Sequence, residues 1–235
     1  MHSSTFVAIL STVTLAQSAA LPSLFPSSLS NLIPKNWPAN KALCPLNKAV
    51  LPASALPAPS NGLALSFIAI GRGTQNYTCS DSTASSIPKA VGAVASLFNA
   101  TCDAARLNVA TLAEVTTLSL NYAIPTSSEA TARLSGHHQF TAAGVPLFML
   151  QTDSVNYGRI EAKVDVKSPA PNDASKGTNG LGSVPWLKLN ATTTEDWQYK
   201  EVYRVHTAGG QAPKTCEGIS GSFTVEYSAQ YWFYA

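Results

Sequence analysis

The chain has 235 residues, enough for one domain with a sizeable core. Only 12% of the residues are charged, about half of the share that is usual in globular proteins, and the formal net charge is +2. No run of Lys or Arg concentrates this charge, so nucleic acid is excluded as an expected partner.

Residues 1–20 have the composition of a secretory signal peptide. A short apolar run over 6–16 is followed by Ser18 and Ala20, small residues that suit a cleavage site. The run is too short to cross a bilayer as a helix, and no later segment is long and apolar enough to do so. We therefore expect an exported protein, extracellular or associated with a cell wall, without a membrane span.

Residues 21–62 contain eight prolines, which exclude regular helix and confine any strand to a sheet edge. This pattern predicts an extended arm laid over the domain and anchored by Cys44, or alternatively a partly disordered leader. We expect residues 63–235 to form a single β-rich domain.

The domain is expected to begin with a strand over 63–70, a hairpin turn at Gly71–Gly73 and a second strand over 74–79. Ser86 and Pro88 then suit the start of a helix, and apolar residues follow them at helical spacing. Apolar residues between 107 and 118 indicate a second helix. Together these segments predict a helical insertion over about 81–135.

Strands are predicted again over 137–141, 145–152 and 158–166, and a polar loop over 167–183. The segments 197–207 and 223–233 alternate apolar and polar residues, which is typical of strands with one buried face. Short strands between Gly/Pro turns predict a mainly β fold, an antiparallel β-sandwich or barrel-like domain with a short helical insertion.

The cysteines and the sequons fit an oxidising, extracellular setting. The chain has four cysteines, Cys44, Cys79, Cys102 and Cys216, which allow three disulfide pairings. Glycosylation sequons begin at Asn76, Asn99 and Asn190. We therefore expect a secreted glycoprotein whose pairing the spacing alone leaves open.

No nucleotide or serine-hydrolase motif is complete. Gly71 and Gly73 match the start of a dinucleotide-binding turn, but Asn76 replaces its third glycine and the segment lies between two predicted strands. The Gly-x-Ser-x-Gly motif of hydrolases is absent from the sequence. We predict no cofactor.

Histidines offer the one candidate metal site. His138 and His206, with Glu201, would supply three ligands if the fold brought them together. The alternative is one imidazole packed in the core and the other at the surface. Because nothing in the sequence fixes their spacing, no metal is predicted, and both histidines are retained as candidate ligand-binding residues.

Aromatic residues are concentrated near the C-terminus. Trp232 and Tyr234 make the second face of the last strand apolar, and Trp186 lies in the same C-terminal block. One explanation is that the arm or the helical insertion covers this face, since large aromatic residues are mostly buried. The other is an exposed platform that stacks on sugar rings or docks lipid, so these three residues are also candidate ligand-binding residues.

Several segments resemble a family of secreted proteins from filamentous fungi and bacteria that is catalogued as a domain of unknown function. The resemblance covers about 44–235 and is carried by residues 69–79, 134–140, 184–189 and 203–213, with Cys216. Fungal members often have the label malate dehydrogenase. NAD-dependent malate dehydrogenase activity is not expected here, because the nucleotide-binding turn is missing. The family brings no catalytic residues to this sequence.

The resemblance also bears on the disulfides. Bacterial relatives tend to keep the cysteines that match Cys79 and Cys216 alone. This implies a Cys79–Cys216 bond, which leaves Cys44 to pair with Cys102. The alternative of Cys79–Cys102 with Cys44–Cys216 stays open.

These features predict a non-catalytic, monomeric protein that binds a cell-wall polysaccharide, a lipid or a surface partner. The alternatives are an extracellular enzyme, either a hydrolase or a metal-dependent oxidase using His138, His206 and Glu201, and a purely structural wall component. Convergence of those three side chains in the fold would favour the enzyme.

Overall fold

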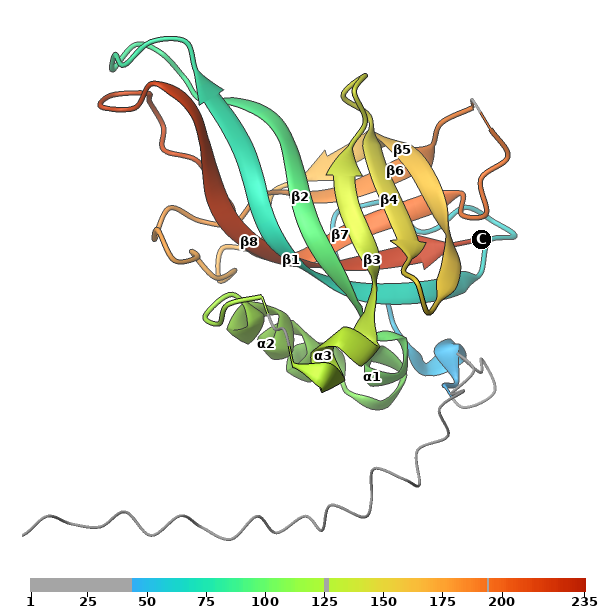
Figure 1. Ribbon diagram of the computed structural model, residues 1–235. Coiled ribbons are helices and arrows are strands. Elements are labelled where there is room, and N and C mark those ends of the chain that lie inside the picture. The colour runs from blue at the N-terminus through green and yellow to red at the C-terminus, as the bar shows by residue number, and fades with distance from the viewer. Residues whose placement is uncertain (1–43, 125–126, 194) are drawn as a thin grey trace, which may run out of the picture. The chain divides into compact units, whose positions relative to one another are not determined.

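The chain folds as a closed β-barrel. The computed structural model describes residues 44–124, 127–193 and 195–235. Eight antiparallel strands pair in chain order, and β8 returns to pair with β1 (Figure 1). The predicted mainly β, barrel-like fold is therefore confirmed. The predicted signal peptide and the first part of the predicted arm lie outside the described residues.

Three helices interrupt the barrel between β2 and β3 (Figure 1). The strands are β1 Leu65–Cys79, β2 Lys89–Asn99, β3 Leu134–Phe140, β4 Pro146–Gln151, β5 Asn156–Ser168, β6 Trp186–Ala191, β7 Glu201–Gly209 and β8 Gly221–Tyr234. The helices are α1 Thr101–Arg106, α2 Val109–Ser119 and α3 Ser128–Arg133, preceded in the arm by the short 3-10 helix η3 Leu46–Lys48. Within the described residues, no helix has the length and apolar character needed to span a membrane.

The alternating strand directions define two ends of the barrel. The β1–β2, β3–β4, β5–β6 and β7–β8 connections lie at one end, which we call the hairpin end. The helical insertion, the β4–β5 turn and the β6–β7 loop lie at the other, the helical end. This division decides where the interior can be reached.

The hairpin turn predicted at Gly71–Gly73 is wrong, because both glycines lie inside the continuous strand β1. A Cβ on Gly73 would come within 1.9 Å of the Val94 carbonyl oxygen, and one on Gly71 within 2.6 Å of the Tyr231 ring. These glycines therefore make room for a close neighbour and do not reverse the chain.

The helix predicted after Pro88 is also wrong, since residues 89–99 form β2. Ala93, Ala95 and Leu97 take alternate places and point into the barrel core. The helical residues cover 101–133, less than the predicted 81–135, and the helix predicted between 107 and 118 is confirmed as α2. The apolar residues of β2 have helical spacing, but strand pairing with β1 and β3 decides its conformation.

The barrel interior is an apolar core that is closed at the helical end. Phe233 packs there against Phe67 and Phe148, with ring centroids 6.0 and 5.6 Å apart. Trp197 and Tyr199, from the β6–β7 loop, join this core and fill the helical end. The interior is therefore sealed at that end by aromatic side chains.

A second apolar cluster lies outside the barrel wall. Trp232 and Tyr234 on β8 pack there with Tyr203 on β7, beneath Leu56 of the arm and Leu112 of α2. Tyr203 Oη donates to the carbonyl oxygen of Pro57 at 2.9 Å, which fastens the arm. The arm and the helical insertion therefore cover the outer face of β8. This confirms the first explanation for its two apolar faces.

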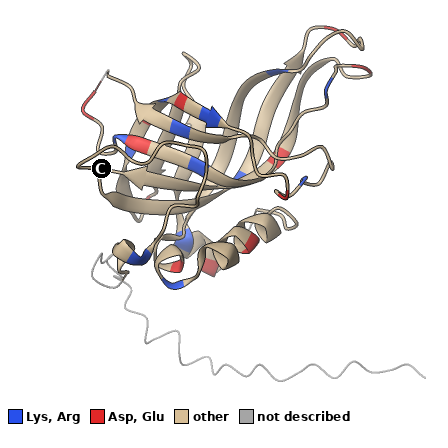
Figure 2. Ribbon diagram, turned by 180° about the vertical axis from the view of Figure 1, so that it is seen from behind, with Lys and Arg blue, Asp and Glu red and all other residues tan. Residues whose placement is uncertain are grey.

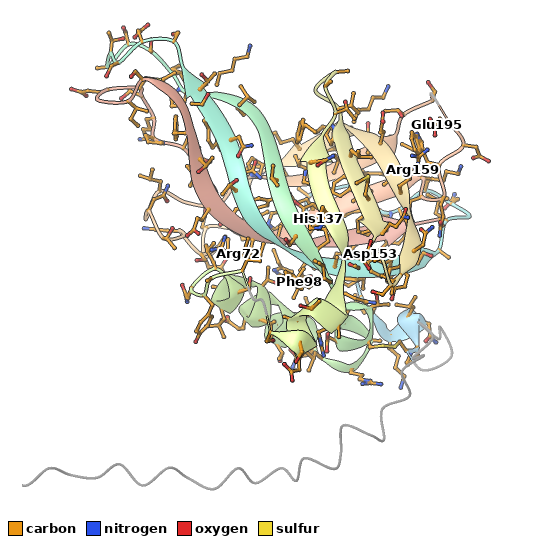
Figure 3. The ribbon with its side chains drawn as sticks, viewed as in Figure 1. Arg72, Phe98, His137, Asp153, Arg159 and Glu195 are labelled. Carbon is orange, nitrogen blue, oxygen red and sulfur yellow. A yellow bond between two sulfur atoms is a disulfide. The ribbon has the colours of Figure 1, made fainter. Side chains whose placement is uncertain are left out.

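Arg72 ties the insertion to the barrel (Figure 3). The residue is 3% exposed and lies on the outer face of β1. The guanidinium donates to the carbonyl oxygens of Ser119 at 3.2 Å and Tyr122 at 3.4 Å, and pairs with Glu226 at 2.8 Å. A cation is favoured here because Ser119 is the last residue of α2.

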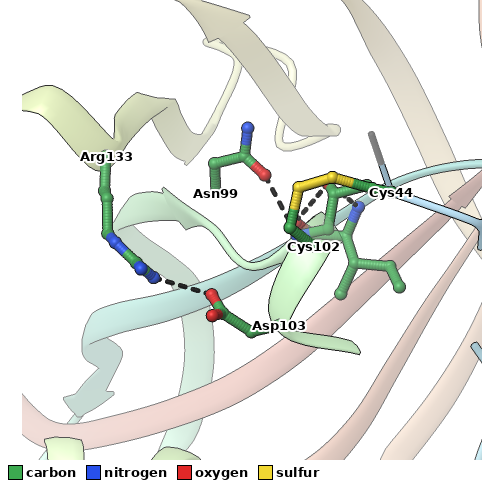
Figure 4. The surroundings of a disulfide bond; sticks show 7 residues. Cys44, Asn99, Cys102, Asp103 and Arg133 are labelled. Carbon is green, nitrogen blue, oxygen red and sulfur yellow. Dashed lines mark hydrogen bonds and ion pairs between the residues drawn. A yellow bond between two sulfur atoms is a disulfide. The ribbon is translucent and has the colours of Figure 1, made fainter. Parts of the chain in front are cut away.

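Replacing Arg72 with methionine is expected to lower the free energy of unfolding by about 2 kcal/mol, because several charge-assisted hydrogen bonds are lost from a buried site. Urea denaturation followed by circular dichroism measures the change. The control is Arg133→Met, which breaks the exposed Arg133–Asp103 pair (Figure 4) and should cost less than about 1 kcal/mol. Equal losses of unfolding free energy in the two variants would mean that Arg72 does not tie the insertion to the barrel.

Two disulfides fasten the outer segments. Cys44 bonds to Cys102, joining the arm to α1 (Figure 4). Cys79 bonds to Cys216, joining the end of β1 to the β7–β8 connection. The pairing implied by the resemblance is therefore the one in the structure, and the alternative pairing is absent from the described residues.

Candidate functional site

A cavity of about 60 Å³ lies inside the barrel, towards the hairpin end. Phe140 and Pro146 flank the β3–β4 turn, which places them at the mouth. With the partly exposed Leu187 and Val164, they give the mouth an apolar rim. The lining residues are Gln75, Ala93, His138, Phe140, Pro146, Phe148, Val164, Leu187, Leu189, Arg204 and Tyr231.

One part of the wall beside the mouth is closed by a side chain. β2 and β3 pair only as far as Ala95 and His138, and beyond this point the two strands have no pairing with each other. Phe140 lies against Gly92 there, where an added Cβ would come within 3.3 Å of the ring. The glycine therefore provides the space that lets the aromatic ring fill this seam.

Arg204 brings a positive charge to the cavity. It has the same strand phase as the core residue Val202 and pairs across the sheet with Leu187 and Tyr231. The residue is 9% exposed, and its Nε and Nη2 donate to the Pro185 carbonyl oxygen at 3.2 and 2.9 Å. Among the described residues, no carboxylate lies within ion-pair distance of this guanidinium.

His138 lies in the cavity wall as a neutral group. Its ring stacks on Phe148, with centroids 4.2 Å apart and planes 10° from parallel. Its Nδ1 lies 3.0 Å from the Leu147 carbonyl oxygen, which can only accept, so Nδ1 holds the proton. Burial lowers the pKa of His138 to about 4, and the charge of Arg204 acts in the same direction. At neutral pH the histidine adds no second positive charge.

Further polar groups converge near Arg204. The hydroxyls of Tyr227 and Tyr231 lie 2.8 Å apart, and burial raises the pKa of Tyr231 although Arg204 opposes this effect. The Nε2 of Gln75 is buried and makes no hydrogen bond within the described part of the chain. Its amide nevertheless lies near Tyr227 and slightly offsets the burial that raises the pKa of that phenol.

The three residues of the hypothetical metal site do not meet. His138 lies in the barrel interior, whereas His206 packs edge-on against Trp186 outside the wall, with centroids 5.0 Å apart. Glu201 is also outside, bound to Lys188 at 3.0 Å and to Ser60 at 2.5 Å. It is five residues from His206 on the same strand, about 16 Å at strand spacing.

No other metal site replaces it. Within the described residues there is no group of three or more His, Cys, Asp or Glu side chains able to hold an ion. His206 has an unusual backbone, with φ at 45°, and its Nε2 is buried without a partner in the described chain. Burial lowers the pKa of this histidine, while nearby Asp173 opposes the shift.

The candidate aromatic residues are not exposed. Trp186, Trp232 and Tyr234 are 3%, 2% and 6% exposed and belong to the outer cluster beneath the arm. An exposed platform made of these three rings is therefore excluded. The residues that line the cavity come from other positions, on strands that are distant from one another in the chain.

The sequon asparagines lie on strands. Asn76, Asn99 and Asn190 are on β1, β2 and β6, and each is half-buried. Asn76 Oδ1 accepts from Thr74 Oγ1 at 3.0 Å, and Asn99 Oδ1 accepts from the Thr101 amide at 3.0 Å. Glycans at these positions stay a prediction.

The sequence reasoning missed Arg204, Gln75 and Tyr231 as site residues. One signal was present: Arg204 occupies an inward phase of an alternating strand, where an apolar residue is expected. The overall charge gave no further indication, because charged residues are few and scattered over strands, helices and loops (Figure 2).

Comparisons with known proteins place the barrel in a family but add no chemistry. Residues 59–235 match a family model described as "Protein of unknown function (DUF3455)". No curated protein and no solved structure matches the chain. The lining residues of the cavity are therefore the basis for its chemistry.

Proposed function

Because the chain belongs to the family described as protein of unknown function (DUF3455), we propose a function from the barrel alone: non-catalytic binding of a small, mostly apolar molecule in the cavity. This proposal selects the lipid-like class from among the polysaccharide, lipid and surface partners that the sequence suggested. It describes a secreted glycoprotein that carries or sequesters its ligand.

The observation that supports this proposal is the character of the cavity. Aliphatic and aromatic side chains form most of its lining, and a few polar groups point inward from different strands. Small-molecule sites commonly combine an apolar wall with a few polar groups that fix orientation. A polysaccharide would need many more hydrogen-bonding partners than this lining offers.

The size of the cavity limits how the ligand is held. A volume of about 60 Å³ leaves space for only a few water-sized groups. One end of the ligand fits in the closed space, and the rest extends through the mouth. The partly exposed side chains of Phe140, Pro146, Val164 and Leu187 offer apolar contact along that path.

Binding without conversion fits the polar groups better than catalysis does. His138 is the only histidine in the cavity lining, and its protonated nitrogen is already bound to Leu147. No carboxylate is among the lining residues to orient it or to act with it. The extracellular enzyme is therefore the less supported alternative.

Export and glycosylation belong to the same proposal. The disulfides Cys44–Cys102 and Cys79–Cys216 are compatible with an oxidising compartment. Peptide mapping of the secreted protein after enzymatic deglycosylation tests for glycans at Asn76, Asn99 and Asn190. Unmodified asparagine at all three positions would refute the proposal that the protein is glycosylated there.

Narrowing the mouth is expected to weaken ligand binding. The neutral fluorescent probe N-phenyl-1-naphthylamine should bind the wild-type protein saturably, and Val164→Trp should raise its dissociation constant at least about tenfold. The control is Val94→Trp, because Val94 is 50% exposed, Val164 is 49% exposed, and only Val164 lines the cavity. Fluorescence titration measures both.

Two results would contradict the proposal. Without saturable binding of the neutral probe, or with equal weakening in the two tryptophan variants, the cavity is not the ligand site. Chemical change of bound ligand during incubation, followed by mass spectrometry, would favour the enzyme.

A further inference from the structure

We infer that the cavity recognises a carboxylate, so that its ligand is an apolar monocarboxylic acid whose anionic end is held by Arg204. The inference rests on the proposed function and specifies the class of ligand. It is carried by the position of Arg204 and by the kind of polar groups around it.

Arg204 is a buried cation whose charge is not compensated within the described chain. Burying a charge is unfavourable unless a partner of opposite charge or several hydrogen bonds offset the cost. Its Nε and Nη2 both donate to the single carbonyl oxygen of Pro185, and the guanidinium also interacts with the Tyr231 hydroxyl, so the partners found for it in the described chain are neutral oxygens. An anion in the cavity would supply the missing charge.

The neighbouring groups are mainly donors. Gln75 Nε2 is a buried donor without a hydrogen bond in the described chain, and the Tyr231 hydroxyl lies across the sheet from Arg204. A carboxylate has only acceptor atoms, so it can use these donors together with the guanidinium. His138 is neutral and does not compete for the anion.

A carboxylate fits better than a more highly charged headgroup. Among the described residues of the lining, Arg204 alone brings a positive charge, since His138 is neutral, and this matches a single negative charge on the ligand. The flat fork of a guanidinium also matches a flat carboxylate. The small closed volume leaves room for such a group but places the apolar tail in the mouth, beside Val164 and Leu187.

The test compares two ligands of nearly equal shape. Octanoate and octanamide are each used to displace N-phenyl-1-naphthylamine from the wild-type protein at neutral pH. We expect octanoate to bind roughly tenfold to a hundredfold more tightly, which is the range for charge-assisted hydrogen bonds. Octyl phosphate, as a third competitor, should bind more weakly than octanoate.

Arg204→Gln should abolish the preference for octanoate while the neutral probe still binds. The matched control is Lys163→Gln, because Lys163 is exposed on β5 next to Val164 and should leave the preference unchanged. If Arg204→Gln does not fold, the comparison of ligands on the wild-type protein decides alone.

Several outcomes would overturn the inference. Equal affinity for octanoate and octanamide, a preference that survives in Arg204→Gln, or tighter binding of octyl phosphate would each refute the carboxylate site while leaving the apolar binding function standing. Failure of the neutral probe to bind at all would refute both.

Discussion

Replacing Cys79 and Cys216 together with alanine is expected to lower the free energy of unfolding by about 5 kcal/mol. The bond joins residues 137 apart in the chain, so it removes much of the freedom of the unfolded state. It also holds the end of β1 against the β7–β8 connection, where Cys216 is fully buried. Urea denaturation of the double variant, followed by far-UV circular dichroism, measures the loss.

The Cys44–Cys102 bond supplies the comparison. It spans 58 residues, and the same loop-closure relation gives about 4 kcal/mol for its removal. Since this bond joins the arm to α1 outside the barrel, its double-alanine variant should still bind the neutral probe. A loss below about 1 kcal/mol for the Cys79 and Cys216 pair would show that the barrel does not depend on its tether.

Acid is expected to destabilise the protein through His138. The pKa of this histidine is about 4 in the folded protein, against an ordinary value of 6.5 when unfolded. Between these values the unfolded chain binds a proton that the folded chain excludes, so stability falls as the pH is lowered from 6.5 to about 4. At about 1.4 kcal/mol per pH unit, the loss is about 3 kcal/mol.

His138→Phe should remove this part of the pH dependence. Urea denaturation at several values between pH 4 and 7 measures the slope for wild type and variant. The matched control is His137→Phe, because His137 is the exposed neighbour on the opposite face of β3 (Figure 3). It should retain the wild-type slope. An unchanged slope in His138→Phe would mean that this imidazole is not held neutral by burial.

Glu201 adds acid sensitivity that both variants share. Burial by itself would raise the pKa of Glu201, but hydrogen bonds from Ser60 and Lys188 outweigh it and lower the pKa. A depressed carboxyl pKa stabilises the fold above the unfolded value, and this contribution is lost as the pH falls through the folded value. The difference between the His138 and His137 variants cancels this common background.

The strands with one face in the barrel were predictable from sequence. Residues 160–164 and 223–233 alternate because each side chain faces either the core or the outside, whereas an irregularity after Val164 turns Val166 to the outer cluster. β2 was misread because its inward positions are Ala93 and Ala95, small residues that also suit helices. β1 was misread because its glycines serve close packing, a requirement visible only once the neighbouring strand is in place.

The candidate site was only partly predictable. His138 was identified and does line the cavity, whereas His206, Trp186, Trp232 and Tyr234 lie outside the barrel wall. Gln75 and Arg204 come from β1 and β7, which are far apart in the chain and face one cavity only because the sheet closes on itself. Sequence spacing carries no information about that closure.

The continuous strand pairing also bears on how copies of this protein behave at high concentration. With 12% charged residues, the surface has little electrostatic repulsion to keep copies apart. Closure of the ladder from β1 to β8 covers the strand edges through which sheets otherwise associate. Resistance to aggregation therefore depends on barrel geometry, and its weakest point is the short β2–β3 seam beyond Ala95 and His138.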